Sequence, residues 1–299
     1  MTPDTVPPSH CKSFLSFLIR YILTFPSSAA FYLEFLPACF YLVLSLSIFR
    51  ILPPNTRWNS ASLRIPPPID ASSDPPIPDA LYSHPVNSDT VNDINLVILT
   101  LLIPSVAALL DGVVTLRAAP RPLRPRPAAP VGGHRGVCAV LTAFGTADWT
   151  TNLAKRAIGR PRPNFWGLVS SSCRGDNAAC DPDPASEMEA RMSMPSNHAS
   201  VAYAGLGLMA FYGLRRARDF ETVARELKIG SVRSAGYRPR GLRGALELME
   251  ITAPLSVALW ISLTRINDCW HHPSDVFVGA MIGILSAIGS YMFWFPPSK

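Results

Sequence analysis

Residues 264–295 read TRINDCWHHPSD followed by VFVGAMIGILSAIGSYMFWF, a short polar cluster joined to a long apolar run. The apolar part, residues 276–295, has about the 20 residues that an α-helix needs to cross a bilayer. It carries no Asp, Glu, Lys or Arg. The stretch therefore predicts a transmembrane helix with polar side chains gathered at its N-terminal end.

The rest of the chain has the composition of a multispanning membrane protein. Of its 299 residues 48% are hydrophobic and only 16% are charged, which is too apolar for an ordinary soluble domain of this length. Other apolar runs of near-spanning length recur along it. We predict an all-α fold, an integral membrane bundle of six transmembrane helices, with spans at 31–52, 94–116, 136–153, 199–214, 245–263 and 276–295.

Two parts of the chain are expected to differ in their relation to the membrane. Residues 1–30 form an N-terminal cytoplasmic or interfacial segment, since Arg20 interrupts its apolar region and argues against a cleaved signal peptide. Residues 31–299 form the six-span domain. Within it, residues 136–295 carry the polar clusters, and residues 215–244 form a basic cytoplasmic insert.

A polar cluster follows the third predicted span. Lys155 and Arg162 are separated by six residues, and Pro161 and Pro163 favour an extended turn that aims both cations at one point. Arg162 can grip a phosphate with two N–H groups, whereas Lys155 acts as a point charge. The alternative is that these cations only anchor the span at the headgroups.

Another cluster, Pro-Ser-Asn-His at residues 195–198, precedes the fourth predicted span. The free backbone N–H groups of a helix start bind anions readily. Ser196 and Asn197 are therefore candidate phosphate ligands, with His198 beside them. The alternative is that Ser196 and Asn197 only cap the helix and that His198 is interfacial.

The cluster before the last span combines Arg265, His271 and Asp275. If the chain is helical there, Asp275 lies on the same face as His271, although Pro273 makes the local backbone uncertain. A carboxylate in that place fixes the imidazole tautomer and leaves the other ring nitrogen free to attack phosphorus. His271 is the predicted nucleophile, whereas His272 is expected to be interfacial.

Loop charges orient the predicted bundle. Basic residues dominate the loops after the second and fourth spans, so both loops should be cytoplasmic. Residues 53–93 are net acidic and belong on the other side. With alternating spans, all three polar clusters then emerge at the non-cytoplasmic interface, where they can share one substrate.

The ordered set K-x6-R-P, P-S-N-H and T-R-x5-H-x3-D resembles the type 2 phosphatidic acid phosphatase (PAP2) superfamily, the lipid phosphate phosphatases. The resemblance covers roughly residues 136–295. Asn197 stands where the family usually has glycine, and Thr264 where it usually has serine. Asn tolerates left-handed backbone and keeps its N–H, so the phosphate contact is expected to survive.

The resemblance implies a phosphatase that works without a metal or other cofactor. Phosphate oxygens would be held by Lys155, Arg162, Ser196, Asn197 and Arg265. His271 would form a phosphohistidine oriented by Asp275, and His198 would protonate the leaving alkoxide. The implied substrates are phosphatidate, lysophosphatidate and diacylglycerol pyrophosphate, and no nucleic-acid partner is expected. The alternatives are a polyprenyl diphosphate phosphatase of the same superfamily and a non-catalytic membrane protein that binds lipid phosphate.

Other features have secondary roles. Asp148, inside the third span, is expected to support Lys155 or another cation. Cys173 and Cys180 lie in a non-cytoplasmic loop and could form a disulfide. Plasma membrane, vacuole and endomembranes all remain open as locations, as does the oligomeric state.

Overall fold

The computed structural model describes residues 33, 36–41, 43–44, 80–118, 131–171, 184–226 and 240–296. The proposed cysteine pair and the predicted segment 1–30 lie outside these residues. Within the described part every regular element is a helix: η2 (Ala80–Tyr82), α4 (Asp93–Val97), η3 (Ile98–Leu102), α5 (Ile103–Ala118), α6 (Val131–Ile158), α7 (Phe165–Ser171), α8 (Pro184–Ala190), α9 (Asn197–Glu226), α10 (Arg240–Asn267) and α11 (Pro273–Trp294).

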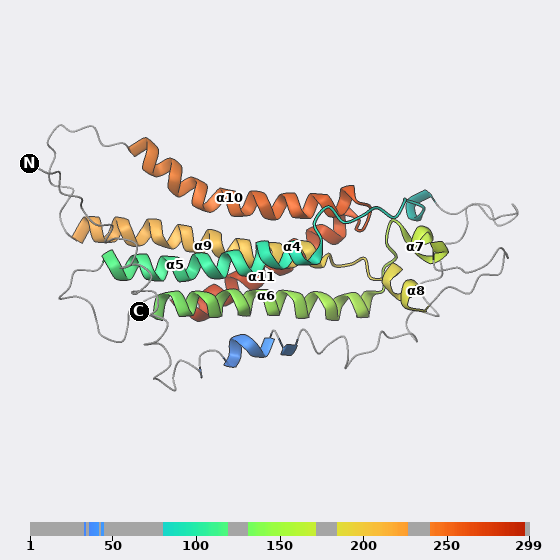
Figure 1. Cartoon of the computed structure of the whole chain (residues 1–299), viewed down its shortest axis with the longest axis horizontal. Helices are drawn as coiled ribbons and strands as arrows, with labels where there is room; N and C mark the ends of the chain where they lie inside the picture. Colours follow the sequence, from blue (N-terminus) through green and yellow to red (C-terminus); the bar gives the residue numbers. More distant parts are fainter. Residues whose placement is uncertain are drawn as a thin grey trace, which may run out of the picture.

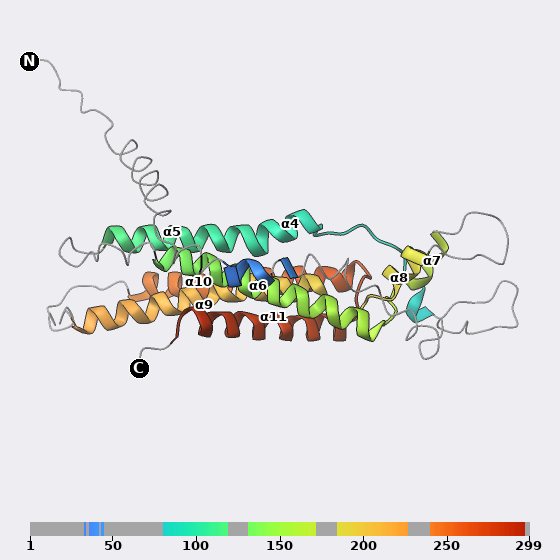
Figure 2. The same ribbon diagram turned by 90° about the horizontal axis from the view of Figure 1, so that it is seen from below.

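The long helices lie side by side in an elongated bundle (Figures 1 and 2). α9 packs against α6, α10 and α11, and α6 also packs against α5 and α11. The short elements η2, α7 and α8 gather at one end of the bundle (Figure 1). The end of α6, the start of α9, the end of α10 and the start of α11 point toward that end.

The all-α prediction is confirmed for the described residues. Five predicted spans fall on the continuous helix 93–118, on α6, on α9, on α10 and on α11, whereas the span 31–52 lies mostly outside the described residues. Three described helical stretches are long and apolar enough to cross a membrane: Asp93–Gly112, Gly244–Asn267 and Pro273–Trp294. The count of six spans stays a prediction.

The fourth predicted span belongs to a helix longer than expected. α9 runs on to Glu226 and so extends into the predicted basic insert 215–244, while α10 already begins at Arg240. The extension RRARDFETVARE is rich in Arg, Ala and Glu, which are good helix formers, so the helix continues past its apolar part.

Two glycines bring α11 into backbone contact with the start of α9. A Cβ atom on Gly279 would lie 2.4 Å from the carbonyl oxygen of Ser196, and one on Gly283 would lie 2.2 Å from that of Ser200. Small residues spaced by four let two helix backbones approach closely in this way. The approach fixes the Pro-Ser-Asn-His segment against the first two turns of α11.

Candidate active site

The predicted site residues come from several elements that end near one another. Lys155 lies in the last turn of α6, Arg265 in the last turn of α10, and Asp275 in the first turn of α11. Almost all of the predicted set is buried, namely Lys155, Arg162, Ser196, His198, Arg265, His271 and Asp275, while Asn197 is half-buried. Buried cations and imidazoles need partners, so the contacts of this group define what it can do.

The His271 ring is held by a backbone carbonyl. Its Nδ1 lies 2.6 Å from the carbonyl oxygen of Ser193. A carbonyl oxygen can only accept, so Nδ1 carries the hydrogen and Nε2 of the neutral ring keeps its lone pair. Burial, followed by the charges of Arg162, Lys155 and Arg265, lowers the pKa of His271 well below its ordinary value. The ring is therefore neutral near pH 7 and close to three cations.

Asp275 does not contact His271 as the sequence suggested. Its fully buried carboxylate accepts from Arg160, from the Ser193 hydroxyl and from His272. The reason is local backbone geometry. α11 begins at Pro273 and its N-cap residue His272 is extended, with φ −76° and ψ 156°, so helical spacing between positions 271 and 275 does not apply.

His272 is a buried cap rather than an interfacial side chain. In the capping box at the start of α11, the His272 ring accepts from the backbone N–H of Asp275 and the Asp275 carboxylate accepts from the backbone N–H of His272. Nδ1 of the ring also lies 3.2 Å from Oδ2 of Asp275. The backbone N–H of His272 donates to the same oxygen at 3.0 Å. The contact satisfies free donors at the helix start.

One indole ring lies against both arginines of the predicted phosphate cradle. The guanidinium carbons of Arg162 and Arg265 lie 5.0 and 5.7 Å from the centroid of the Trp270 ring. Both distances are within the range of a cation–π interaction. Trp270 therefore holds the two cations close to each other.

Each of these arginines also meets a carboxylate from outside the three clusters. Arg162 pairs with the side chain of Glu189 and donates to the Glu189 carbonyl at 2.8 Å, and Arg265 pairs with Asp89 at 2.7 Å. Burial lowers the pKa of Arg162, and the charge of Glu189 opposes that change. Both guanidinium groups therefore bind anionic groups, which is what contact with a phosphate requires.

Several buried polar atoms at the site have no hydrogen-bond partner among the described residues. They include Nε and Nη1 of Arg265 and Oγ of Ser196. Unsatisfied buried donors are costly and rare in folded proteins, and they commonly mark the place of a ligand. These donors suit the oxygens of an anion.

His198 is held by a segment that the sequence did not single out. Residues 84–91, called the strap here, run without helical structure between η2 and α4 across the clustered helix ends (Figure 1). Nε2 of His198 donates to the carbonyl of Val91 at 3.0 Å. The indole N–H of Trp270 donates to Asn87 O, and Thr90 bonds the carboxylate of Asp268. The backbone N–H of His84 also donates to the Pro163 carbonyl at 3.2 Å, so the strap contacts all three clusters.

Asn197, the departure from the usual family glycine, has a partner of its own. Its side-chain amide donates to Oδ1 of Asp148 at 2.7 Å. α9 begins at Asn197, so the backbone N–H of this residue is one of the free donors of a helix start. The side chain is tied toward α6 while the backbone donor remains at the site.

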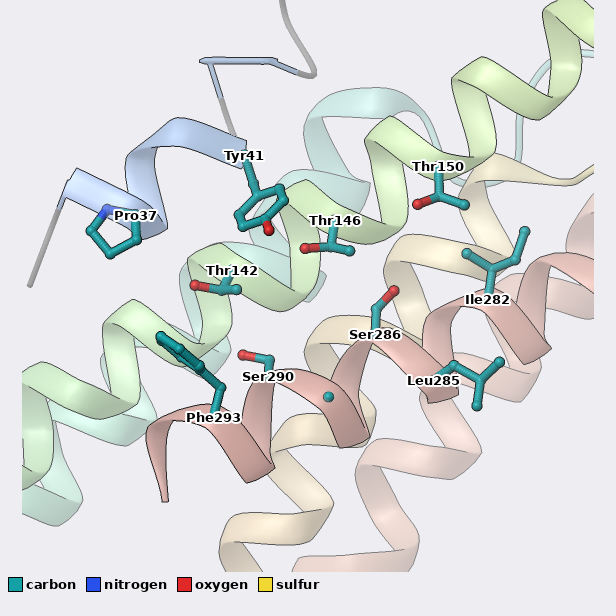
Figure 3. Close-up of a pocket in the computed structure, with 11 residues that line it drawn as sticks. Pro37, Tyr41, Thr142, Thr146, Thr150, Ile282, Leu285, Ser286, Ser290 and Phe293 are labelled. Carbon is teal, nitrogen blue, oxygen red and sulfur yellow. The ribbon is translucent and has the colours of Figure 1, made fainter. Parts of the chain in front are cut away.

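A separate groove of about 520 Å³ lies along the bundle between α6, α11 and the helical piece 36–41 (Figure 3). Most of its lining is apolar, including Pro37, Ile282, Leu285 and Phe293. Hydroxyl groups also line it, among them those of three threonines one helical turn apart, Thr142, Thr146 and Thr150. Thr150 precedes Lys155 by five positions on α6, about 7.5 Å along the helix axis.

Residues 136–298 match the sequence profile of the PAP2 superfamily. The chain belongs to the PAP2 superfamily. As a PAP2 protein it is similar to Lipid phosphate phosphatase 2 of Arabidopsis thaliana, with 30% identity over 55% of this chain and 52% of the relative. It is similar to Probable diacylglycerol pyrophosphate phosphatase 1 of Schizosaccharomyces pombe, with 30% identity over 49% and 48%. It is also similar to human Phospholipid phosphatase 2, with 31% identity over 50% of each chain.

This PAP2 chain therefore spans about half the length of the curated relatives it matches. No solved structure matches it. The strap lies outside the residues matched to the superfamily. Asp89 and Val91, through which it contacts Arg265 and His198, therefore lie outside them too. Sequence reasoning also missed Arg160, Trp270 and Ser193, although Arg160 stands inside the K-x6-R-P spacing and could have been noticed as an extra cation.

Proposed function

We propose that this PAP2 protein is a membrane lipid phosphate phosphatase that cleaves phosphate monoesters such as phosphatidate through a phosphohistidine on His271. The observation that carries the proposal is a buried His271 whose Nδ1 bonds the Ser193 carbonyl and whose Nε2 is left free, with a pKa lowered first by burial and then by three neighbouring cations. A nucleophile next to concentrated positive charge suits attack on a phosphoryl group, because charge on its oxygens must be stabilised in the transition state.

The cations and helix-start donors would hold the phosphate. Lys155, Arg162 and Arg265 supply charge, and Ser196 and the N–H of Asn197 supply hydrogen bonds. Supporting this role, Arg265 and Ser196 carry the buried donors described above. The substrate phosphate would take over the contacts that Glu189 and Asp89 make with the two arginines.

The reaction proceeds in two displacements. Nε2 of His271 attacks phosphorus, the P–O ester bond breaks, and the leaving alkoxide takes a proton from Nδ1 of His198 to leave as an alcohol. Burial lowers the pKa of His198 to about 4, so Nδ1 would carry this proton only with the negative phosphate bound beside it. Water then attacks the phosphohistidine and the N–P bond breaks. Inorganic phosphate leaves, and the proton released from the water returns to His198.

Lipid is the proposed substrate class for two reasons. The relatives are named as phosphatases of lipid phosphates, phospholipids and diacylglycerol pyrophosphate. In addition, the groove beside Thr150 and Ile282 is mostly apolar and begins within about two helical turns of the site, which suits an acyl chain. We place the site at headgroup level on the non-cytoplasmic side of a six-span bundle, in line with the loop charges.

Phosphate release by the full-length protein purified in detergent micelles tests the proposal. The panel should hold phosphatidate, lysophosphatidate, diacylglycerol pyrophosphate and a polyprenyl diphosphate, each with and without a chelator. We expect release from phosphatidate that is unaffected by the chelator. Release from the polyprenyl diphosphate alone would favour that substrate, and a folded protein inactive on the whole panel would overturn the proposal.

A further inference from the structure

We propose that Ser193 is a positioning residue that connects Asp275 to the nucleophile His271, and that Arg160 holds Asp275 in place for this task. The inference rests on the proposed function, because it assumes that His271 attacks phosphorus. It replaces the expected direct contact between Asp275 and His271 with a relay through one buried serine.

Every polar group of Ser193 is engaged. Its hydroxyl donates to Oδ2 of Asp275 at 2.6 Å, its carbonyl accepts from Nδ1 of His271 at 2.6 Å, and its N–H donates to the carbonyl of Arg160 at 3.0 Å. The residue is fully buried. A side chain and backbone fixed at three points cannot rotate, so the carbonyl that aims the imidazole has a fixed direction.

Arg160 closes the network from the other side. Its Nη1 lies 2.6 Å from Oδ1 of Asp275 and 2.7 Å from Oγ of Ser274. The two oxygens of the carboxylate are therefore divided, one for Arg160 and one for Ser193 and His272. This division leaves the charge of Asp275 compensated and its position defined, as a buried carboxylate requires.

The arrangement has a chemical consequence for the nucleophile. When Nε2 bonds to phosphorus, the ring becomes positively charged and still donates Nδ1–H to the carbonyl of Ser193. The Ser193 hydroxyl donates to the Asp275 carboxylate, and the Ser193 carbonyl accepts from the ring. Only Ser193 therefore stands between the negative charge of Asp275 and the ring. The relay therefore aims the ring before attack and stabilises it afterwards, as a carboxylate does by direct contact in other enzymes.

The test compares S193A with S262A in purified full-length protein. S193A removes the hydroxyl but keeps the carbonyl. Ser262 is a matched control, because it is also buried and its hydroxyl also donates, to the Ala258 carbonyl at 2.8 Å, but it lines neither the site nor the groove. We expect S193A to lower kcat on phosphatidate by about 10- to 100-fold, the range for a hydrogen bond to a charged group, with KM unchanged. S262A should keep the kcat of the unmodified protein.

A double variant separates positioning from mere packing. In a D275N background, S193A should lower kcat by less than about threefold, because the charge of Asp275 that Ser193 transmits to His271 is already gone. An equal loss in both backgrounds would overturn the inference. The inference would also be overturned if the S193A protein were less stable to heat but its folded fraction kept the full kcat.

Should S193A not fold, R160Q supplies the measurement, with R156Q as the control from the same part of the chain. We expect R160Q to lower kcat by about tenfold or more, since it removes a charged hydrogen bond to Asp275. Full activity of R160Q would then overturn the inference. Failure of the proposed function is a different outcome, because the unmodified protein itself would release no phosphate.

Discussion

Nη2 of Arg265 lies 2.7 Å from Oδ1 of Asp89, although the two residues are 176 positions apart in the chain. Arg265 belongs to the cluster before α11, whereas Asp89 belongs to the strap. Under the proposed function, the carboxylate holds a donor that a phosphate oxygen would take over. Substrate and strap would then compete for one guanidinium group.

Replacing Asp89 by Asn should tighten the binding of phosphate. The amide keeps the shape of the side chain but removes the negative charge beside the anion site, and like charges there cost affinity. We expect the inhibition constant of inorganic phosphate, measured against phosphatidate hydrolysis, to fall by about threefold or more.

E187Q is the matched control for that change. Glu187 also pairs with an arginine, Arg191 at 2.9 Å, but Arg191 is not in the predicted phosphate cradle. The inhibition constant of E187Q should equal that of the unmodified protein. A D89N protein with the same inhibition constant as E187Q would contradict the competition.

The two adjacent histidines should respond very differently to replacement by Asn. H271N removes the nucleophile and is expected to lower kcat more than about 10³-fold, with no phosphoenzyme trapped. H272N keeps a good N-cap residue at the start of α11, so we expect a loss below about tenfold. Trapping of labelled phosphoenzyme after an alkaline quench distinguishes them. A labelled H271N protein would show that another residue carries the phosphoryl group.

The pH profile should reflect the lowered pKa of His271. Its neutral form is the proposed nucleophile, and a pKa well below the ordinary 6.5 keeps that form populated as the pH falls. The acid limb of kcat/KM should therefore lie below pH 6.5. Changing Lys155 to Met removes one of the charges that lower the pKa, so the limb should move to higher pH. A limb that stays in place would contradict the electrostatic assignment.

Gly283 to Ala should destabilise the bundle. The added Cβ would lie 2.2 Å from the carbonyl oxygen of Ser200, so α9 and α11 must separate, at a cost of about 1–3 kcal/mol. Gly289 to Ala is the control on the same helix, since its Cβ would meet nothing within 4 Å. Thermal unfolding in detergent should show a lower midpoint for the first variant and not for the second. Equal midpoints would contradict the close approach of the two backbones.

The sequence was sufficient to predict five of the spans as helices and the gathering of the clusters, because polar residues stood at the ends of apolar runs. It was not sufficient to predict which histidine Asp275 contacts. That pairing depends on where α11 begins, and a start at Pro273 leaves His271 outside the helix. Spacing arguments hold inside a helix and fail one residue before it.

The partners of the two predicted catalytic histidines were also beyond sequence reasoning. Ser193 and Val91 contact His271 and His198 through their carbonyl oxygens. Every residue has a carbonyl oxygen, so no pattern of side chains in the sequence predicts which one a histidine will contact. The carboxylates Asp89 and Glu189 were overlooked for another reason, because only the folded chain brings them to Arg265 and Arg162.

The strap joins its neighbours largely through main-chain atoms: His84 N to Pro163, Asn87 O to Trp270 and Val91 O to His198. Apart from Asp89 and Thr90, whose side chains bond Arg265 and Asp268, the side chains along it can therefore be exchanged without loss of these bonds. Deleting or inserting one residue is a different event, because it shifts the register of every later carbonyl against its fixed partner. The bonds of this segment therefore depend more on its length than on the identity of most of its side chains.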